Sequence, residues 1–206
     1  MTPVIPKHAI TEADVRTAAR AGRTLDLPAG AVVTPAARDL ASTLGVALRE
    51  AQDGAPARPI VALGADHGGF PLKEQLKNVI AESGCDVLDL GTHDAQPVDY
   101  PDFAVAVARA VAAGRAWRGI MIDGAGIGSA MAANKIAGIR AALCYDLTTA
   151  QNAREHNDAN VLTLGGTLIG TRLAVDIVRT FLSAAFGGGR HAKRVAKITA
   201  LDAGRG

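Results

Sequence analysis

The sequence predicts an α/β protein with a five-stranded parallel sheet covered by helices on both faces. From residue 59 onward, short apolar runs alternate with amphipathic helical segments, an order typical of strands joined by helical crossovers. The apolar runs contain few polar residues, as expected for parallel strands that are buried on both sides. A small, mostly helical extension, residues 1–58, precedes this domain, which spans residues 59–206.

The elements of the predicted domain follow from local sequence patterns. Ser129 is expected to cap the third helix of the domain. Because crossovers between parallel strands are right-handed, a ligand is expected at the carboxyl ends of the strands. Strands are expected at residues 60–63, 87–90, 120–122, 139–144 and 160–164, and helices at 71–83, 102–113, 130–135, 148–156, 171–185 and 189–201.

The extension has its own pattern. Thr11 and Thr34 each precede a helical segment, and Pro35 suits a first helical position. Short extended pieces are expected at 25–28 and 31–33, and residues 54–59 have the composition of a linker. We find no internal repeat. Two alternatives stay open for the extension: a lid or oligomer contact, or a docking segment for a larger assembly.

Composition excludes several functional classes. The chain has 22 Lys and Arg against 20 Asp and Glu, and only 3% aromatic residues, so nucleic-acid binding is not expected. No apolar run approaches the ~20 residues of a membrane span, and no signal-type core is seen near residue 1, so a cytoplasmic protein is expected. Cys85 and Cys144 are interpreted as buried free thiols, with a disulfide as the alternative. The five histidines are too scattered to predict a metal site.

The segment 119–140 contains the most informative motif. An apolar run ends at Asp123 and is followed by Gly124, Gly126 and Gly128. Glycines at this spacing let backbone N–H groups approach an anion, and the helix start behind them adds a positive dipole end. A carboxylate beside such a cradle is unusual, so Asp123 is the candidate catalytic residue. A dinucleotide site is the weaker alternative, because the third glycine of that motif is missing.

Other candidate residues lie near strand ends. Asp66 and His67 follow the first strand, although Asp66 could simply cap the next helix. His156 ends a helix, where it could instead satisfy the last carbonyl groups. Arg190 and Arg194 share one face of the terminal helix, which could equally be a solvated basic face.

Taken together, five segments resemble the ribose-5-phosphate isomerase B / galactose-6-phosphate isomerase family. The resemblance implies a Rossmann-like three-layer α/β/α sandwich and an aldose–ketose isomerase of the EC 5.3.1 type, acting on a phosphorylated sugar without metal or organic cofactor. It also implies a homodimer or homotetramer with active sites shared between subunits. The segments are GADHGGFPLK (64–73), DYPDFA (99–104), GAGIG and AANKIAGIRAAL (within 124–143), REHNDANVL (154–162) and GGRHAKRVAKI (188–198).

The resemblance also implies roles for individual residues. The phosphate would be held by His67 and by the two arginines, lent by the partner subunit, while His156 would help to open the sugar ring. Asn157 and Asp66 would bind hydroxyl groups, and the amides of residues 124–128 would stabilise an enediolate. The implied substrate-binding residues are Asp66, His67, Gly124, Gly126, Gly128, Asn157, Arg190 and Arg194.

The chain departs from the family at the residue expected to move the proton. Asp123 replaces a cysteine that transfers the proton between C1 and C2 in much of the family, and Ala125 replaces a threonine. Desolvation beside the apolar loop would make Asp123 a stronger base than a carboxylate in water. Ribose 5-phosphate is the first expected substrate, a four- or six-carbon sugar phosphate the second. A non-catalytic sugar-phosphate-binding subunit is the alternative.

The extension carries a shorter resemblance. Residues 10–41 are similar to segments on enzymes of bacterial microcompartments. This similarity implies that residues 1–58 contact shell proteins and that the protein lies inside such a compartment.

Overall fold

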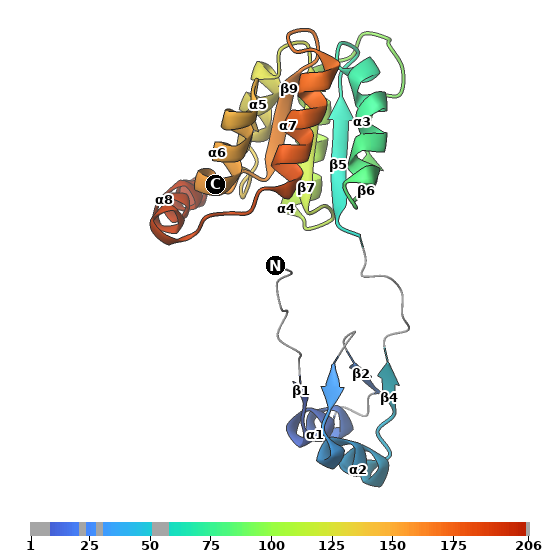
Figure 1. Ribbon diagram of the computed structural model, residues 1–206. Coiled ribbons are helices and arrows are strands. Elements are labelled where there is room, and N and C mark those ends of the chain that lie inside the picture. The colour runs from blue at the N-terminus through green and yellow to red at the C-terminus, as the bar shows by residue number, and fades with distance from the viewer. Residues whose placement is uncertain (1–8, 21–23, 28–30, 51–57, 205–206) are drawn as a thin grey trace. The chain divides into compact units, whose positions relative to one another are not determined.

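The computed structural model describes residues 9–20, 24–27, 31–50 and 58–204. The chain divides into two compact units, Met1–Ala57 and Arg58–Gly206, which are treated separately (Figure 1). Most of the predicted linker, residues 54–59, lies outside the described residues.

The larger unit contains the predicted five-stranded parallel sheet. Every neighbouring pair of strands is parallel, and the order across the sheet is β6-β5-β7-β9-β8. The five strands and six helices alternate along the chain as the sequence predicts (Figure 1). The strands are β5 (Ile60–Ala65), β6 (Asp86–Asp89), β7 (Arg118–Asp123), β8 (Ala141–Leu143) and β9 (Val161–Gly165).

Helices cover both faces of this sheet. One face packs against α3 (Phe70–Glu82), α6 (Leu147–Asn157) and α7 (Thr171–Ser183), and the other against α4 (Tyr100–Ala112) and α5 (Ile127–Ala133). The last helix, α8 (Gly189–Ala200), buries none of its residues and extends away from the sandwich, ending in the short 3-10 turn η1 (Leu201–Gly204) (Figure 1).

The strand order changes direction beside β5. From β5 the chain crosses to β6 on one side, and it later returns to β7 on the other side of β5. The loops that follow β5 and β7 therefore diverge, which in parallel sheets of this kind opens a ligand site at the carboxyl edge.

The helix behind the glycine loop begins earlier than expected. Its N-cap is Gly126, with φ at 78°, and Ser129 is a fully buried residue inside α5. The expectation that Ser129 caps this helix is therefore wrong. A positive φ at the cap favours glycine, because a side chain would be strained there.

One buried charge network joins α3 to the end of β6. The side chain of Lys73 is fully buried, and its Nζ contacts both carboxylate oxygens of Asp89 at 2.7 and 2.8 Å. Lys77 contacts the same carboxylate at 2.6 Å, and the Gly91 amide donates to it at 3.0 Å. Burial opposes ionisation of Asp89, but hydrogen bonds from these donors outweigh it and lower the pKa of Asp89 to about 2. Asp89 thus neutralises a lysine that water does not reach.

Both cysteines are buried and free, which confirms the thiol interpretation. Burial raises the pKa of the Cys144 thiol to about 11 and also raises that of Cys85. Because the thiolate is the reactive form, neither cysteine is suited to act as a nucleophile.

The smaller unit contains four short strands besides its two predicted helices. The strands form two parallel pairs, and the helices pack over a separate core that includes Val15, Ala37 and Ala41. Its elements are β1 (Ala9–Ile10), α1 (Glu12–Arg20), β2 (Leu25–Leu27), β3 (Val32–Val33), α2 (Pro35–Leu44) and β4 (Leu48–Glu50).

The pairing of these strands shows an internal repeat, contrary to our sequence expectation. Ala9 pairs with Val32 and Leu25 pairs with Leu48, so each strand of the first half lies beside the residue 23 positions later. The threonines before the two helices, Thr11 and Thr34, have the same separation. The unit is therefore two copies of a strand–helix–strand element. Few positions are identical between the copies, which is why the repeat is hidden in the sequence.

Replacing Asp89 with Asn should destabilise the larger unit, because the buried Lys73 loses its closest carboxylate and keeps only Glu74, a more exposed partner at 3.1 Å. We expect the free energy of unfolding at neutral pH, measured by urea denaturation, to fall by about 3 kcal/mol. The pKa of Asp89 is lowered from 3.8 to about 2. Its contribution should therefore be complete above about pH 4 and disappear as the pH falls toward about 2, where the wild type and the variant converge.

Asp86→Asn is the matched control. Asp86 pairs with Arg58 at 3.5 Å on the surface, with side chains 57% and 44% exposed. Such pairs contribute less than about 1 kcal/mol. Equal effects of the two substitutions, or a stability gap for Asp89→Asn that persists at about pH 2, would contradict this account.

Candidate active site

Two of the predicted site segments meet at the carboxyl edge of the sheet. Asp66 and His67 directly follow β5, and Asp123 is the last residue of β7. The Asp66 amide donates to the carbonyl oxygen of Ile122 at 3.1 Å, which fixes the two strand ends side by side. These residues therefore lie together at the carboxyl edge, where the sequence analysis expects a ligand.

The Asp123 carboxylate fills the amide cradle of its own loop. Its Oδ1 accepts hydrogen bonds from the Ala125 amide at 2.8 Å and from the Gly126 amide. Its Oδ2 accepts from the Ser129 amide at 3.1 Å and from the Ser129 hydroxyl. The residue is only 4% exposed. A carboxylate has about four acceptor positions, and here all of them are used.

This geometry corrects the expected role of Asp123. A general base needs a lone pair within hydrogen-bond reach of the substrate proton. Asp123 has none left, and its carboxylate is buried in the loop instead of facing the crevice. It also occupies the amides of Ala125 and Gly126, which were expected to stabilise an enediolate. The physical reason is that the first anion within reach of the cradle is the loop's own carboxylate.

Three amides of the loop 124–128 remain unpaired. Among the described residues, the amides of Gly124, Ile127 and Gly128 have no acceptor. Tyr100 lies over Gly128 so closely that a Cβ there would be 2.5 Å from the phenol oxygen. Glycine is required at that position because any side chain would collide with the ring.

Three hydroxyl groups that the sequence analysis missed hold the loop's carbonyl groups. The Thr167 hydroxyl donates to the Gly124 carbonyl oxygen at 2.6 Å, and the Tyr145 hydroxyl to that of Ala125 at 2.7 Å. Thr163, fully buried within β9, donates to the Gly126 carbonyl oxygen at 2.9 Å. A hydroxyl residue inside an otherwise apolar strand was the available signal for Thr163. Together these bonds keep the loop in one conformation.

The two polar residues after β5 are held differently. Asp66 is 7% exposed, and its Oδ1 accepts from the Gly69 amide at 2.9 Å. His67 is exposed, and its Nδ1 accepts from the Val98 amide at 3.2 Å. In the neutral ring the proton is therefore on Nε2, which is free to donate to an anion.

The remaining predicted residues lie at the opposite edge of the sheet. His156 and Asn157 end α6 just before β9 starts, whereas Asp123 pairs with Gly165 at the end of β9. At ~3.3 Å per residue, the strand alone separates the two groups by roughly 15 Å. Figure 1 shows the loops after β5 and β7 at one end of the unit and α8 at the other. One chain therefore does not bring all the predicted site residues together, and His156 and Asn157 lie at the edge opposite Asp66 and Asp123.

Specific contacts hold the polar residues at this opposite edge, near the end of α6 and the start of α8. The rings of His156 and His191 stack with centroids 4.1 Å apart and an interplanar angle of 5°. Partial burial, followed by the positive charges of His156 and of the neighbouring arginines, lowers the pKa of His191. The Gly187 amide donates to the Glu155 carbonyl oxygen at 2.8 Å and ties the segment before α8 to the end of α6.

An Arg–Asp–Arg clamp fixes the backbone at Asn157. Asp158, in the left-handed conformation with φ at 47°, contacts Arg154 at 2.8 Å and Arg140 at 3.0 Å. Arg140 also donates to the Asn157 carbonyl oxygen at 3.2 Å. The clamp thereby sets the direction in which the end of α6 presents its polar side chains.

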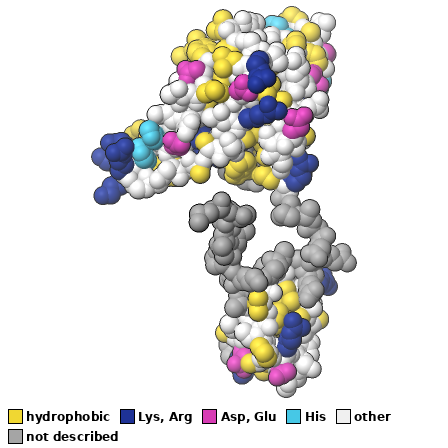
Figure 2. Space-filling view, in the orientation of Figure 1, with side chains coloured by type: hydrophobic (Ala, Val, Ile, Leu, Met, Phe, Trp, Pro, Cys, Tyr) yellow, Lys and Arg dark blue, Asp and Glu magenta, His cyan; other side chains and the backbone are white. Residues whose placement is uncertain are grey.

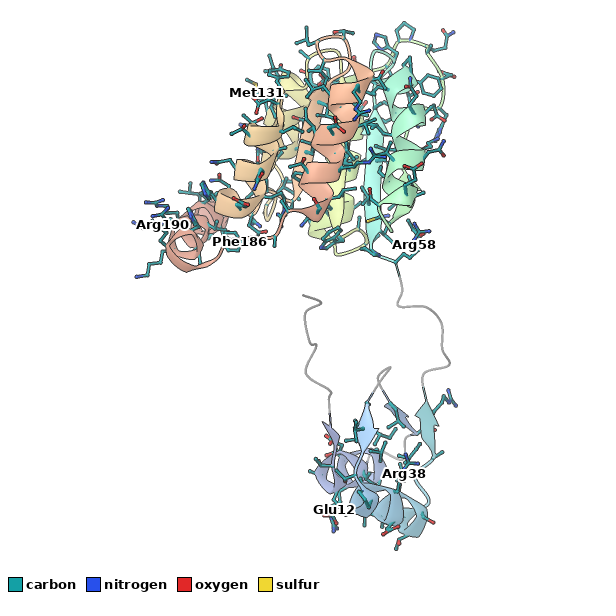
Figure 3. The ribbon with its side chains drawn as sticks, viewed as in Figure 1. Glu12, Arg38, Arg58, Met131, Phe186 and Arg190 are labelled. Carbon is teal, nitrogen blue, oxygen red and sulfur yellow. The ribbon has the colours of Figure 1, made fainter. Side chains whose placement is uncertain are left out.

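The helix α8 carries a basic surface beside these histidines. Figure 2 shows Lys and Arg side chains gathered at its outer end next to histidine, and Figure 3 places Arg190 at that end, away from the sheet. Arg190 and Arg194 are exposed, so their guanidinium groups are available to an anion outside this chain.

In the part of the chain that the structure describes, no group of three or more His, Cys, Asp and Glu side chains is arranged to hold a metal ion. Every helix in this part of the chain is too short or too polar to cross a bilayer.

The larger unit is similar to known isomerases. The family described as Ribose/Galactose Isomerase matches residues 61–198. Ribose-5-phosphate isomerase B of Escherichia coli strain K12 is 46% identical over 142 residues, which are 69% of this chain and 95% of that protein.

Solved structures agree with this match. Ribose-5-phosphate isomerase B of Clostridium thermocellum superposes with a TM-score of 0.70 at 48% identity, covering 71% of this chain and 99% of that chain. The type B ribose 5-phosphate isomerase of Trypanosoma brucei gives a TM-score of 0.69 at 46% identity, covering 70% and 99%. With the family model matching residues 61–198 and relatives above 40% identity over most of their length, the chain belongs to the Ribose/Galactose Isomerase family.

Proposed function

We propose that the protein is an aldose–ketose isomerase that interconverts ribose 5-phosphate and ribulose 5-phosphate by proton transfer through an enediolate. Family membership supports an isomerase of phosphorylated sugars. The observation that carries the proposal is the chemistry of the side chains and amides at the two edges of the sheet. The carboxyl edge offers a carboxylate and free amides. The end of α6 and helix α8, at the other edge, offer imidazole, amide and guanidinium groups.

These groups supply what the reaction needs. Enediolate formation requires a base at carbon and hydrogen-bond donors at the developing oxyanion. At the carboxyl edge, Asp66 offers a carboxylate, and Gly124 and Gly128 offer amides. Ring opening requires proton transfer at the ring oxygen, for which His156 is suited.

The phosphate would be bound at the far end of the sugar. His67 offers Nε2 as a donor, and Arg190 and Arg194 offer forked guanidinium donors that match phosphate oxygens. Asn157 and Asp66 would bind the sugar hydroxyls between these ends.

We propose further that the active site is shared between two copies of the chain. The two groups lie at opposite edges of one sheet, so a sugar phosphate of a few ångströms cannot reach both within one subunit. A second copy placed with α8 against the carboxyl edge would bring His156, Asn157, Arg190 and Arg194 to the loops after β5 and β7. In this arrangement the partner lends the end of α6 as well as the two arginines.

Mixing two inactive variants should restore activity if the site is shared. Asp66→Asn removes one half of the site and His156→Asn the other. In a heterodimer, one of the two sites contains neither substitution, so random pairing of equal amounts should give about a quarter of wild-type activity. The measurement is ketose formation after the two proteins are unfolded and refolded together.

Refolding each variant alone is the control and should give no recovery. A mixture with no more activity than its components would show that both groups act within one subunit.

The substrate is best tested with a panel of aldose phosphates with four to six carbons. We expect ketose formation and wash-in of solvent deuterium at C1 or C2, with ribose 5-phosphate the best substrate. A non-catalytic binding subunit is the second candidate, favoured by the burial of Asp123 where much of the family has a cysteine. Such a protein would bind a sugar phosphate, detected by calorimetry, without any deuterium exchange.

We propose that the N-terminal unit is a docking module for shell proteins of a bacterial microcompartment. Its compact core, separate from that of the isomerase unit, is consistent with an independent attachment role. Its short resemblance to segments on microcompartment enzymes supports the choice of partner.

Deleting residues 1–57 should leave kcat and KM of the isomerase reaction unchanged, because the carboxyl-edge crevice and α8 belong to the larger unit. Co-purification with co-expressed shell proteins should be lost. If the truncated protein still co-purifies with the shell, the docking assignment is wrong. Loss of isomerase activity on truncation would point instead to the lid or oligomer-contact alternative.

A further inference from the structure

Two carboxylates lie near the crevice, and their surroundings differ. Asp123 accepts four hydrogen bonds and has no acceptor position left. Asp66 accepts one, at Oδ1 from the Gly69 amide at 2.9 Å. Within the described part of the chain, no buried side-chain oxygen lacks a partner. Because Oδ2 of Asp66 receives no hydrogen bond there, this oxygen must be accessible from outside the protein.

Asp66 and a free amide flank Gly68 on the same side. A Cβ on Gly68 would be 3.4 Å from Asp66 Oδ1 and 3.6 Å from the Gly124 nitrogen. Because glycine has no side chain, the approach to both groups over Gly68 is open. A reacting carbon bound over Gly68 can therefore lie near a carboxylate and an unpaired N–H donor. This juxtaposition is the one that proton abstraction next to a carbonyl group requires.

The surroundings of Asp66 suit a role as a general base better than a role limited to binding a sugar hydroxyl. The residue is 7% exposed, so little water competes for its carboxylate. The Gly69 bond fixes the orientation of the side chain, and the bond between the Asp66 amide and the Ile122 carbonyl oxygen fixes its backbone. A rigid, partly desolvated carboxylate with a free oxygen is suited to accept a proton from carbon.

We propose that Asp66 is the general base of the isomerisation and that Asp123 is a positioning residue that holds the loop. The proposal rests on the proposed isomerase function. Asp66 removes the proton from C2 of the open-chain aldose, and the C2–H electrons form the C1–C2 double bond. The carbonyl oxygen at C1 becomes the enediolate oxygen, stabilised by the Gly124 amide. Asp66 then returns the proton to C1, while the O2 proton passes to O1, which completes the ketose.

Asp123 acts in this scheme through the loop. By binding the amides of Ala125, Gly126 and Ser129, it fixes the turn from which the Gly124 amide points toward the loop after β5. Its charge is already engaged, so it prepares the site without exchanging a proton with the substrate.

The test compares Asp66→Ala, Asp66→Asn and Asp123→Asn in the full-length protein. The readout is loss of deuterium from [2-²H]ribose 5-phosphate, measured by NMR. Both Asp66 variants should lose about 10²–10⁴-fold in kcat for this exchange. Asp66→Asn keeps an acceptor for the Gly69 amide, so its loss of activity should reflect the missing carboxylate and not a misfolded loop. Asp123→Asn should lower the melting temperature and lose less exchange than either Asp66 variant.

Chemical rescue separates a base from a structural carboxylate. Acetate and fluoroacetate are similar in size and differ in basicity, and either can enter the space left in Asp66→Ala. Rescue of deuterium loss should be greater for acetate, because proton transfer from carbon follows the basicity of the acceptor. Equal rescue by the two anions would indicate a filled cavity and would overturn the proposal.

The remaining outcomes are also decisive. Asp66→Ala with near-wild-type exchange, or Asp123→Asn with the larger loss, would overturn the assignment of the base while leaving the isomerase function intact. A wild-type protein that exchanges no proton with any aldose phosphate of the panel would overturn the proposed function and the base together.

Discussion

The carboxyl edge of the sheet depends on one interaction, the closure of the glycine loop around the Asp123 carboxylate. An amide cradle at a helix start attracts an anion, and here the nearest anion is covalently part of the loop. The carboxylate neutralises the positive end of α5 and engages the donors of Ala125, Gly126 and Ser129. Hydroxyl groups from the neighbouring segments hold the loop's carbonyl oxygens. What remains for a ligand is a small set of unpaired amides and the carboxylate across the crevice.

The sheet could be predicted from sequence because buried parallel strands leave a pattern that few other structures share. The importance of Asp123 could also be predicted, since a charge beside three alternating glycines requires an explanation. The direction in which the Asp123 carboxylate points could not be predicted. A carboxylate next to free amides can turn outward to a ligand or inward to the loop, and sequence spacing permits both. The inward turn is chosen by short-range geometry, in particular by the Ser129 hydroxyl.

The topology alone could have predicted that Asp66 and His156 lie at opposite edges of the sheet, although the order of the sequence motifs does not show it. A residue that follows a parallel strand lies at the carboxyl edge, and a residue that directly precedes one lies at the amino edge. Asp66 follows β5, whereas His156 precedes β9. Motif order along the chain identifies the family without showing which edge each motif occupies. The Arg–Asp–Arg clamp at Asp158 stabilises the amino-edge residues, so each edge of the sheet is held by contacts of its own.

The duplicated strand–helix–strand element of the N-terminal unit has a consequence for its cooperativity. Each strand in one copy finds its backbone partner in the other copy, so a single copy of about 23 residues would leave its strand edges without hydrogen bonds. The two halves therefore depend on each other, and the unit should form and unfold as a whole.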